Sequence, residues 1–146
     1  MDLRSGDTIF ALSTGTGRAA LAVVRVSGEQ VRFVLETMAG PLPPPRRLVR
    51  RSLHDPATGE RLDDALAVFF PGPASFTGED CAELHIHGGL AVRTGVLQAL
   101  AGLKGCRPAE PGEFARRALS AGKMNLAEIE GLADLIDAET SLQRRQ

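Results

Sequence analysis

The sequence has no tryptophan, no tyrosine and only two cysteines among its 146 residues. Apart from six scattered phenylalanines, it therefore lacks the aromatic platforms on which proteins stack nucleic-acid bases. Cys81 and Cys106 have no CxxC spacing and no neighbouring cysteine, which argues against a disulfide framework and against structural zinc. We expect two reduced thiols and a cytoplasmic protein.

Long apolar runs and an excess of one charge are also absent. No segment approaches the roughly 18 apolar residues of a membrane span, and residues 1–8 contain no apolar core of a secretion signal. Seventeen basic and eighteen acidic residues give a net charge of −1, so no overall charge attracts nucleic acid. The basic cluster of residues 46, 47, 50 and 51 fits a solvated edge strand better than a phosphate contact. We expect a soluble chain of about one domain.

Apolar runs separated by glycine and proline predict elements in the order β-β-α-β-β-β-α. The expected strands cover residues 8–12, 20–26, 47–53, 65–70 and 81–87. The first helix has a capping-box pattern, with Ser27 as the cap and Gln30 as its partner, and it ends at Gly40. The second begins after Gly89 and ends at Gly105. Helices on one side of a mixed or antiparallel sheet make a two-layer α+β domain.

A glycine-rich loop, STGTGR at residues 13–18, lies between the first two expected strands. Such loops hold phosphate when they end in Gly-Lys-Ser/Thr and open a helix. This loop lacks that ending and precedes a strand. We interpret it as a hairpin turn.

From Pro111 onward the pattern is helical. A short helix and a loop at residues 120–124 precede a long helix, which Asn125 caps with Glu128 three residues on. The long helix has an apolar stripe that finds no partner in the rest of the sequence: Leu126, Ile129, Ala133 and Ile136. We expect it to be the first helix of a truncated helical domain, and we divide the chain into residues 1–118 and 119–146.

One segment, SFTGEDCAELHIHGG at residues 75–89, places three carboxylates and two histidines around a short apolar run. In a strand over residues 81–87, the period of two places Glu83, His85 and His87 on one face and the apolar residues on the other. Arg25 is a charge inside the apolar run of residues 20–26. A buried guanidinium needs a carboxylate or a ligand, and the sequence leaves both open.

Three functions fit these polar residues. The first is a metal-dependent enzyme, with Glu83, His85 and His87 as ligands of iron or zinc. The second is a small-molecule site, in which Glu83 accepts two parallel N–H bonds from an amidine-like edge such as that of a pterin. Arg25 and Lys123 would meet the anionic part of that ligand. The third is a purely structural dimerisation module whose polar residues form ion pairs.

Three segments resemble, in order and spacing, the N-terminal region of the bacterial tRNA modification GTPase family MnmE, also called TrmE. They are VVRVSG (23–28), PGPASFTGEDCAELHIHGG (71–89) and RPAEPGEFARRALSAGKMNLAEIEGLADLIDA (107–138). The resemblance covers nearly the whole chain. It departs from the family pattern at TGTGR (14–18), where a proline-containing turn is usual, at Leu119 in place of Phe, and at Asn125 in place of Asp.

The resemblance implies a domain similar to the folate-binding domains of one-carbon enzymes. Such a domain binds a tetrahydrofolate derivative such as 5-formyltetrahydrofolate and forms a homodimer. The family's folate-binding arginine, glutamate and lysine fall on Arg25, Glu83 and Lys123, which leaves His85 and His87 in supporting roles.

The resemblance also implies parts that these 146 residues do not contain. In the family, a helical domain carries a GTP-binding domain that uses GTP with Mg²⁺ and K⁺. With the FAD-dependent partner MnmG, the whole protein modifies carbon 5 of the wobble uridine of tRNAs. Because this chain has no P-loop, we expect it to supply folate binding and dimerisation and to hold no catalytic residue.

Overall fold

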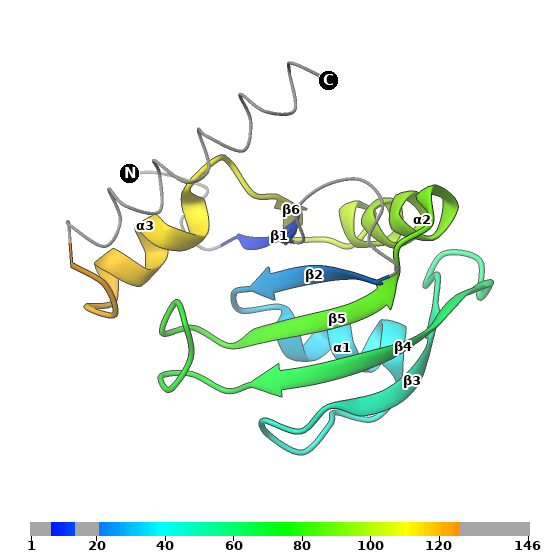
Figure 1. Cartoon of the computed structure of the whole chain (residues 1–146), viewed down its shortest axis with the longest axis horizontal. Coiled ribbons are helices and arrows are strands. Elements are labelled where there is room, and N and C mark those ends of the chain that lie inside the picture. The colour runs from blue at the N-terminus through cyan, green and yellow to red at the C-terminus, as the bar shows by residue number, and fades with distance from the viewer. Residues whose placement is uncertain (1–6, 14–20, 126–146) are drawn as a thin grey trace.

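The computed structural model describes residues 7–13 and 21–125, which fold into an α+β domain (Figure 1). The strands are β1 (Thr8–Leu12), β2 (Leu21–Ser27), β3 (Val49–His54), β4 (Arg61–Phe70), β5 (Cys81–His87) and β6 (Cys106–Pro108). The helices are α1 (Val31–Ala39), α2 (Leu90–Ala101) and α3 (Glu113–Ser120). The predicted α+β class is confirmed. Strand β6 was not predicted, because so short a segment, with a proline in it, shows no period of two.

Within the described residues, the six strands form one sheet in the order β3-β4-β5-β2-β1-β6. Neighbouring strands run antiparallel except β1 and β6, which run parallel. The antiparallel pairing of β1 with β2 is the one that a hairpin requires, and residues 14–18 of the predicted turn lie outside the described residues. Arg50 and Arg51 lie on β3 at one edge of the sheet, as the sequence predicted.

Helices α1 and α2 pack on the same face of the sheet. Every second residue of the central strands is apolar and buried there, together with residues of both helices, in one cluster that includes Ala22, Val24, Val26, Val34, Leu35, Ala82, Leu84, Ile86, Val96 and Leu100. Figure 1 shows α1 behind the central strands. The opposite face of β2, β4 and β5 therefore carries the alternate residues, which include the polar ones.

The end of the described chain bears on two further predictions. Helix α3 confirms the short helix expected after Pro111. The long helix expected from Asn125 lies outside the described residues, so the division at residue 118 stays a prediction. In the described part of the chain, no helix is long and apolar enough to cross a membrane.

Candidate functional site

Strand register brings the candidate residues together on the sheet face opposite α1 and α2. In the antiparallel pairing of β2 with β5, Arg25 lies directly opposite Glu83. In the pairing of β4 with β5, Glu83 lies opposite Val68. Residues opposite one another on one face of a sheet are within reach of each other's side chains. Arg25, Glu83 and Val68 thus form a cross-strand row, and its two charged members form the floor of the site.

Glu83 is the centre of this row. Its Oε2 accepts a hydrogen bond from Arg25 Nη2 at 3.3 Å, and its Oε1 lies 3.0 Å from His85 Nε2. The ion pair is partly buried, with 36% of the Arg25 side chain and 22% of the Glu83 side chain exposed. A carboxylate has about four lone-pair directions, so acceptor capacity remains on both oxygens. Arg25 therefore has the carboxylate partner that its position required, and Glu83 can still accept bonds from a ligand.

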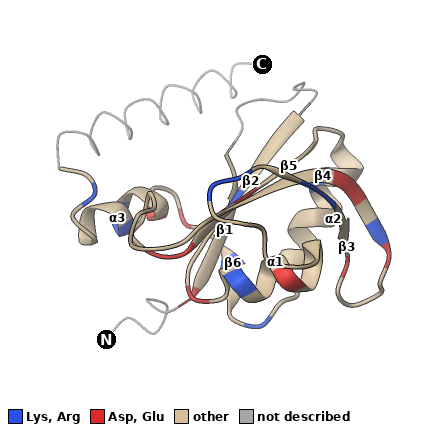
Figure 2. Ribbon diagram, turned by 90° about the horizontal axis from the view of Figure 1, so that it is seen from below, with Lys and Arg blue, Asp and Glu red and all other residues tan. Residues whose placement is uncertain are grey.

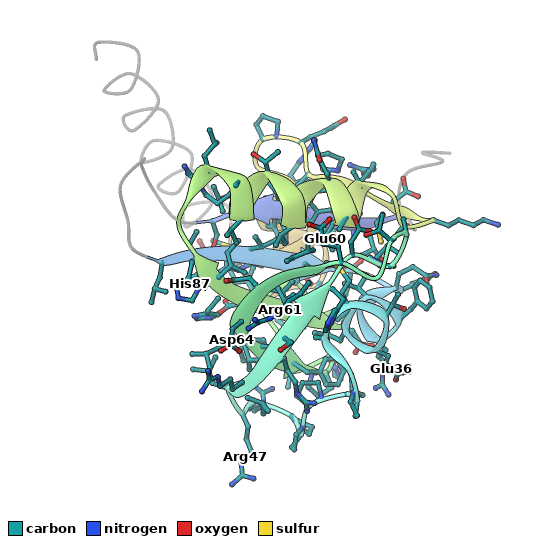
Figure 3. The ribbon with its side chains drawn as sticks, turned by 90° about the vertical axis from the view of Figure 1, so that its right-hand side faces the viewer. Glu36, Arg47, Glu60, Arg61, Asp64 and His87 are labelled. Carbon is teal, nitrogen blue, oxygen red and sulfur yellow. The ribbon has the colours of Figure 1, made fainter. Side chains whose placement is uncertain are left out.

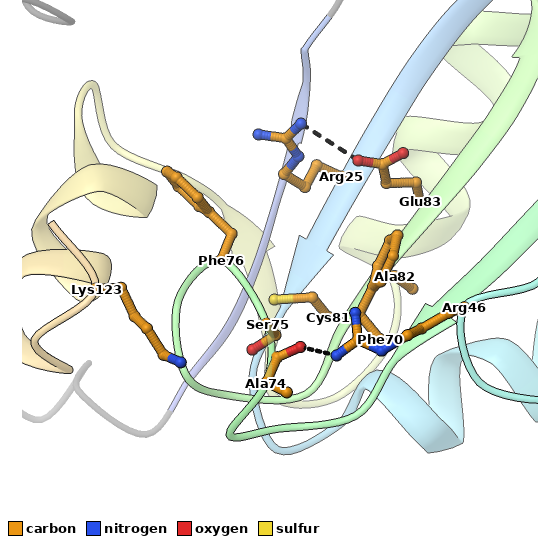
Figure 4. A pocket seen from close by; sticks show the side chains of 10 residues that line it. All are labelled: Arg25, Arg46, Phe70, Ala74, Ser75, Phe76, Cys81, Ala82, Glu83 and Lys123. Atoms are coloured by element: carbon orange, nitrogen blue, oxygen red, sulfur yellow. Dashed lines mark hydrogen bonds and ion pairs between the residues drawn. The ribbon is translucent and has the colours of Figure 1, made fainter.

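A cavity of about 460 Å³ opens above this floor (Figure 4). Its lining comes from β2, the end of β4, the loop before β5, β5 itself and the segments flanking β3 and α3: Arg25, Arg46, Phe70, Ala74, Ser75, Phe76, Cys81, Ala82, Glu83 and Lys123. The guanidinium carbon of Arg25 lies 5.7 Å from the centroid of the Phe76 ring. Arg25, Glu83 and Lys123, predicted from three distant segments, thus line one cavity.

Arg46 is a lining residue that the sequence did not single out. It was assigned to a solvated edge strand, but β3 begins only at Val49. Its guanidinium donates a hydrogen bond to the Ala74 carbonyl and lies 5.9 Å from the Phe70 ring centroid. No periodicity marks such a residue, because it follows a proline-rich connector and belongs to neither helix nor strand.

The predicted capping box at Ser27 is wrong. Strand β2 continues through Ser27, which pairs with Cys81 on β5, so its side chain faces away from α1. Its hydroxyl lies 2.7 Å from Thr77 Oγ1 and donates to Glu79 Oε2 at 2.7 Å. Helix α1 is instead preceded by Gln30, whose backbone N–H donates to Thr8 Oγ1 at 2.8 Å.

The polar residues of the loop before β5 hold that loop in place. Thr77 and Glu79 bind Ser27, as described above. Asp80 accepts hydrogen bonds from the backbone N–H of Gly72 at 2.9 Å and from Arg32 Nε at 3.1 Å. These side chains therefore anchor the loop whose residues Ala74, Ser75 and Phe76 form one wall of the cavity.

The geometry does not support Glu83, His85 and His87 as the ligands of one metal ion. His85 contacts Glu83, whereas both the backbone N and Nδ1 of His87 lie 2.9 Å from the Asp63 carboxylate. The His87 side chain, labelled in Figure 3, is 63% exposed, and His87 is not among the residues that line the cavity. Among the described residues, no group of three His, Cys, Asp or Glu side chains could hold a metal ion. Although they share a strand face, the three predicted ligands do not converge.

Comparison with known proteins assigns the chain to a family. The family model described as the N-terminus of the GTP-binding protein TrmE matches residues 8–123. The chain belongs to this TrmE family. The match begins at the first residue of β1 and ends at Lys123, so it contains every residue that lines the cavity.

Individual relatives agree with the TrmE family match. The tRNA modification GTPase MnmE of Beijerinckia indica is 61% identical over 140 residues, which cover 96% of this chain and 31% of the relative. The mitochondrial 5-taurinomethyluridine tRNA synthase subunit GTPB3 of Homo sapiens is 59% identical over 144 residues, which cover 97% of this chain and 29% of the relative. The chain spans about a third of the length of these curated relatives, and it corresponds to the N-terminal region of tRNA modification GTPases.

In this TrmE-family chain, an ionic network holds α3, and with it Lys123, beside the sheet. Arg107 donates to both carboxylate oxygens of Glu113 at 2.8 and 2.6 Å and to Asp7 Oδ2 at 3.0 Å. Arg117 donates to Glu79 Oε2 at 2.9 Å. Figure 2 shows basic and acidic segments side by side at α3. The hydrogen bond from Arg107 lowers the pKa of Glu113 from 4.5 to about 2, against the opposing effect of burial.

The lowered pKa of Glu113 predicts how the free energy of unfolding changes in acid. In the folded chain, the pKa of Glu113 lies below its ordinary value of 4.5. The contribution of Glu113 to the free energy of unfolding is therefore complete above pH 4.5 and is lost as pH falls to about 2. We expect Glu113→Gln to be less stable than the wild type at neutral pH and to lose less stability between pH 4.5 and 2. Urea titrations at stepped pH measure this, with Glu36→Gln on the exposed side of α1 as the control. If the free energy of unfolding fell equally between pH 4.5 and 2 in the wild type and in Glu113→Gln, the stabilising role of the ionised Glu113 carboxylate would be contradicted.

Proposed function

We propose that this chain binds a tetrahydrofolate one-carbon derivative, such as 5-formyltetrahydrofolate, in the cavity lined by Arg25, Glu83 and Lys123. The observation that carries the proposal is the convergence of these three residues on one cavity, with a carboxylate on its floor. The 2-amino and ring N–H groups of a pterin form a donor pair that a carboxylate accepts side by side. Glu83 takes this edge, and His85 orients the carboxylate from the same strand.

The remaining lining supports a ligand with a flat ring system and polar substituents. A volume of about 460 Å³ lies in the range of roughly 300–1,000 Å³ that is usual for small-molecule sites. Phe70 and Phe76 supply aromatic surface, and Phe76 is 40% exposed. Arg25 and Lys123 supply cationic donors for the ligand's carbonyl or carboxylate groups.

We further propose that the chain acts as the N-terminal region of a tRNA modification GTPase. In that protein, a separate domain binds GTP with Mg²⁺ and K⁺, and the FAD-dependent partner MnmG joins in modifying carbon 5 of the wobble uridine of tRNAs. The family match and the similarity to tRNA modification GTPases support this role. Folate held by this chain supplies the one-carbon unit, and GTP hydrolysis belongs to residues outside it. The free cysteines Cys81 and Cys106 fit a cytoplasmic protein.

We propose homodimerisation through the sheet face that carries the site. Leu21 and Leu66 belong to that face and are 56% and 39% exposed. Large apolar side chains exposed on one face of a sheet are typical of an interaction surface. Sedimentation velocity over a range of concentrations tests this, and a strict monomer at the highest concentration would refute it.

The proposed folate site is tested by calorimetric titration of the chain with 5-formyltetrahydrofolate. We expect saturable binding with one site per chain. A flat titration would refute folate binding and leave the structural dimerisation module as the remaining function. A metal assay on the same sample tests the ligand set of Glu83, His85 and His87 independently.

A further inference from the structure

The residues that line the cavity carry more positive than negative charge. Three cations, Arg25, Arg46 and Lys123, line it together with one carboxylate, that of Glu83. Arg25 and Glu83 compensate each other through their 3.3 Å ion pair. Within residues 7–13 and 21–125, neither Arg46 nor Lys123 forms a salt bridge. Two cations thus remain for a ligand to neutralise.

These two cations lie beside the loop that carries Ala74 and Ser75. In Figure 4, Arg46 and Lys123 come from opposite sides toward Ala74 and Ser75, whereas Arg25 and Glu83 project from the strands. An elongated ligand whose donor edge meets Glu83 would therefore present its other end to Arg46 and Lys123.

Arg46 is held so that its guanidinium stays at the cavity. Its backbone N–H donates to the Phe69 carbonyl at 2.8 Å, and its side chain donates to the Ala74 carbonyl beside the Phe70 ring. A guanidinium has five N–H donors, and its fork matches a carboxylate. The bond to Ala74 positions the group and leaves other donors for a ligand.

We propose that Arg46 and Lys123 form an anion subsite that binds the acidic tail of the ligand. This proposal rests on the folate site proposed above, because a folate carries a glutamate tail with two carboxylates at the end opposite its pterin. Two cations facing two carboxylates give charge complementarity at that end. Arg46 is thereby a ligand-binding residue that selects folates with an acidic tail over tail-less pteroates.

The test compares two ligands, 5-formyltetrahydrofolate and the tail-less 5-formyltetrahydropteroate, on the wild type and on Arg46→Met. Methionine keeps a flexible chain against Phe70 and removes the charge. Because Arg46 is solvent-exposed, we expect a loss of about 3- to 10-fold in affinity for the folate. The pteroate keeps a single carboxylate on its benzoate ring, so its affinity should fall less than that of the folate. Added salt should likewise weaken binding of the folate more than that of the pteroate.

The control is Arg47→Met, which makes the same change of charge at the next residue. Arg47 is exposed, lies outside the cavity lining and points away from the body of the chain (Figure 3). We expect both ligands to bind this variant as they bind the wild type. Equal weakening of both ligands by Arg46→Met, or no weakening of either, would overturn the subsite alone. Failure of the wild type to bind either ligand would overturn the proposed function and the subsite with it.

Discussion

Replacing Glu83 by alanine is expected to weaken binding of 5-formyltetrahydrofolate by about 30- to 1,000-fold. A carboxylate that accepts two N–H bonds from one ligand edge contributes ~2–4 kcal/mol of binding free energy, and each 1.4 kcal/mol is a factor of ten. The same substitution leaves the Arg25 guanidinium without its carboxylate on the floor of the cavity. Isothermal titration calorimetry measures the change directly.

Two further variants distinguish a ligand contact from a general effect of charge. Glu83→Gln keeps the size and one acceptor oxygen, so its loss should be smaller than that of the alanine variant. Glu60→Ala removes a carboxylate from the exposed turn between β3 and β4, outside the cavity lining (Figure 3). We expect it to bind like the wild type. Unchanged affinity in a folded Glu83→Ala variant would show that the pterin edge is bound elsewhere.

Replacing Gly78 by alanine is expected to disturb both the fold and the site. Gly78 has a φ of 81°, and a Cβ atom there would lie 2.7 Å from Ala121 Cβ and 3.9 Å from Lys123 Cε. The left-handed conformation costs an L residue about 1–2 kcal/mol, and the overlap adds about 1–3 kcal/mol unless the segment after α3 moves away. We therefore expect a clear fall in the midpoint of thermal unfolding, and weaker folate binding because Lys123 is displaced.

Gly59 offers a matched control for the conformational part of this effect. It has a similar φ of 77°, but no atom lies within 4 Å of the position that a Cβ would take. Gly59→Ala should therefore lose only the conformational part of the stability and keep folate affinity. The double variant Gly78→Ala/Ala121→Gly removes the overlapping methyl group and should recover part of the affinity. If Gly78→Ala behaves like Gly59→Ala in both measurements, close packing at Ala121 does not position Lys123.

Local patterns predicted the central elements well, because the period of a strand depends on nearby residues alone. The alternation in β5 was predicted over residues 81–87, and the structure buries its apolar residues and turns Glu83 and His85 to the other face. Ser27 shows the limit of the same reasoning. Its capping-box spacing is a local signal, but pairing of β2 with β5 extends through Ser27 and directs its hydroxyl to Thr77 and Glu79.

By itself, the sequence determined the α+β class and the faces of β5. Through family resemblance it also suggested Arg25, Glu83 and Lys123 as ligand-binding residues, which stays a prediction. Tertiary structure decided which groups meet. The strand order β3-β4-β5-β2-β1-β6 pairs Arg25 with Glu83 across 58 positions of the chain and His87 with Asp63 across 24. Arg46 reaches the cavity from a connector without any periodic signal. Such contacts follow from sheet register and loop closure, which depend on residues far apart in the chain and leave no trace in a local pattern.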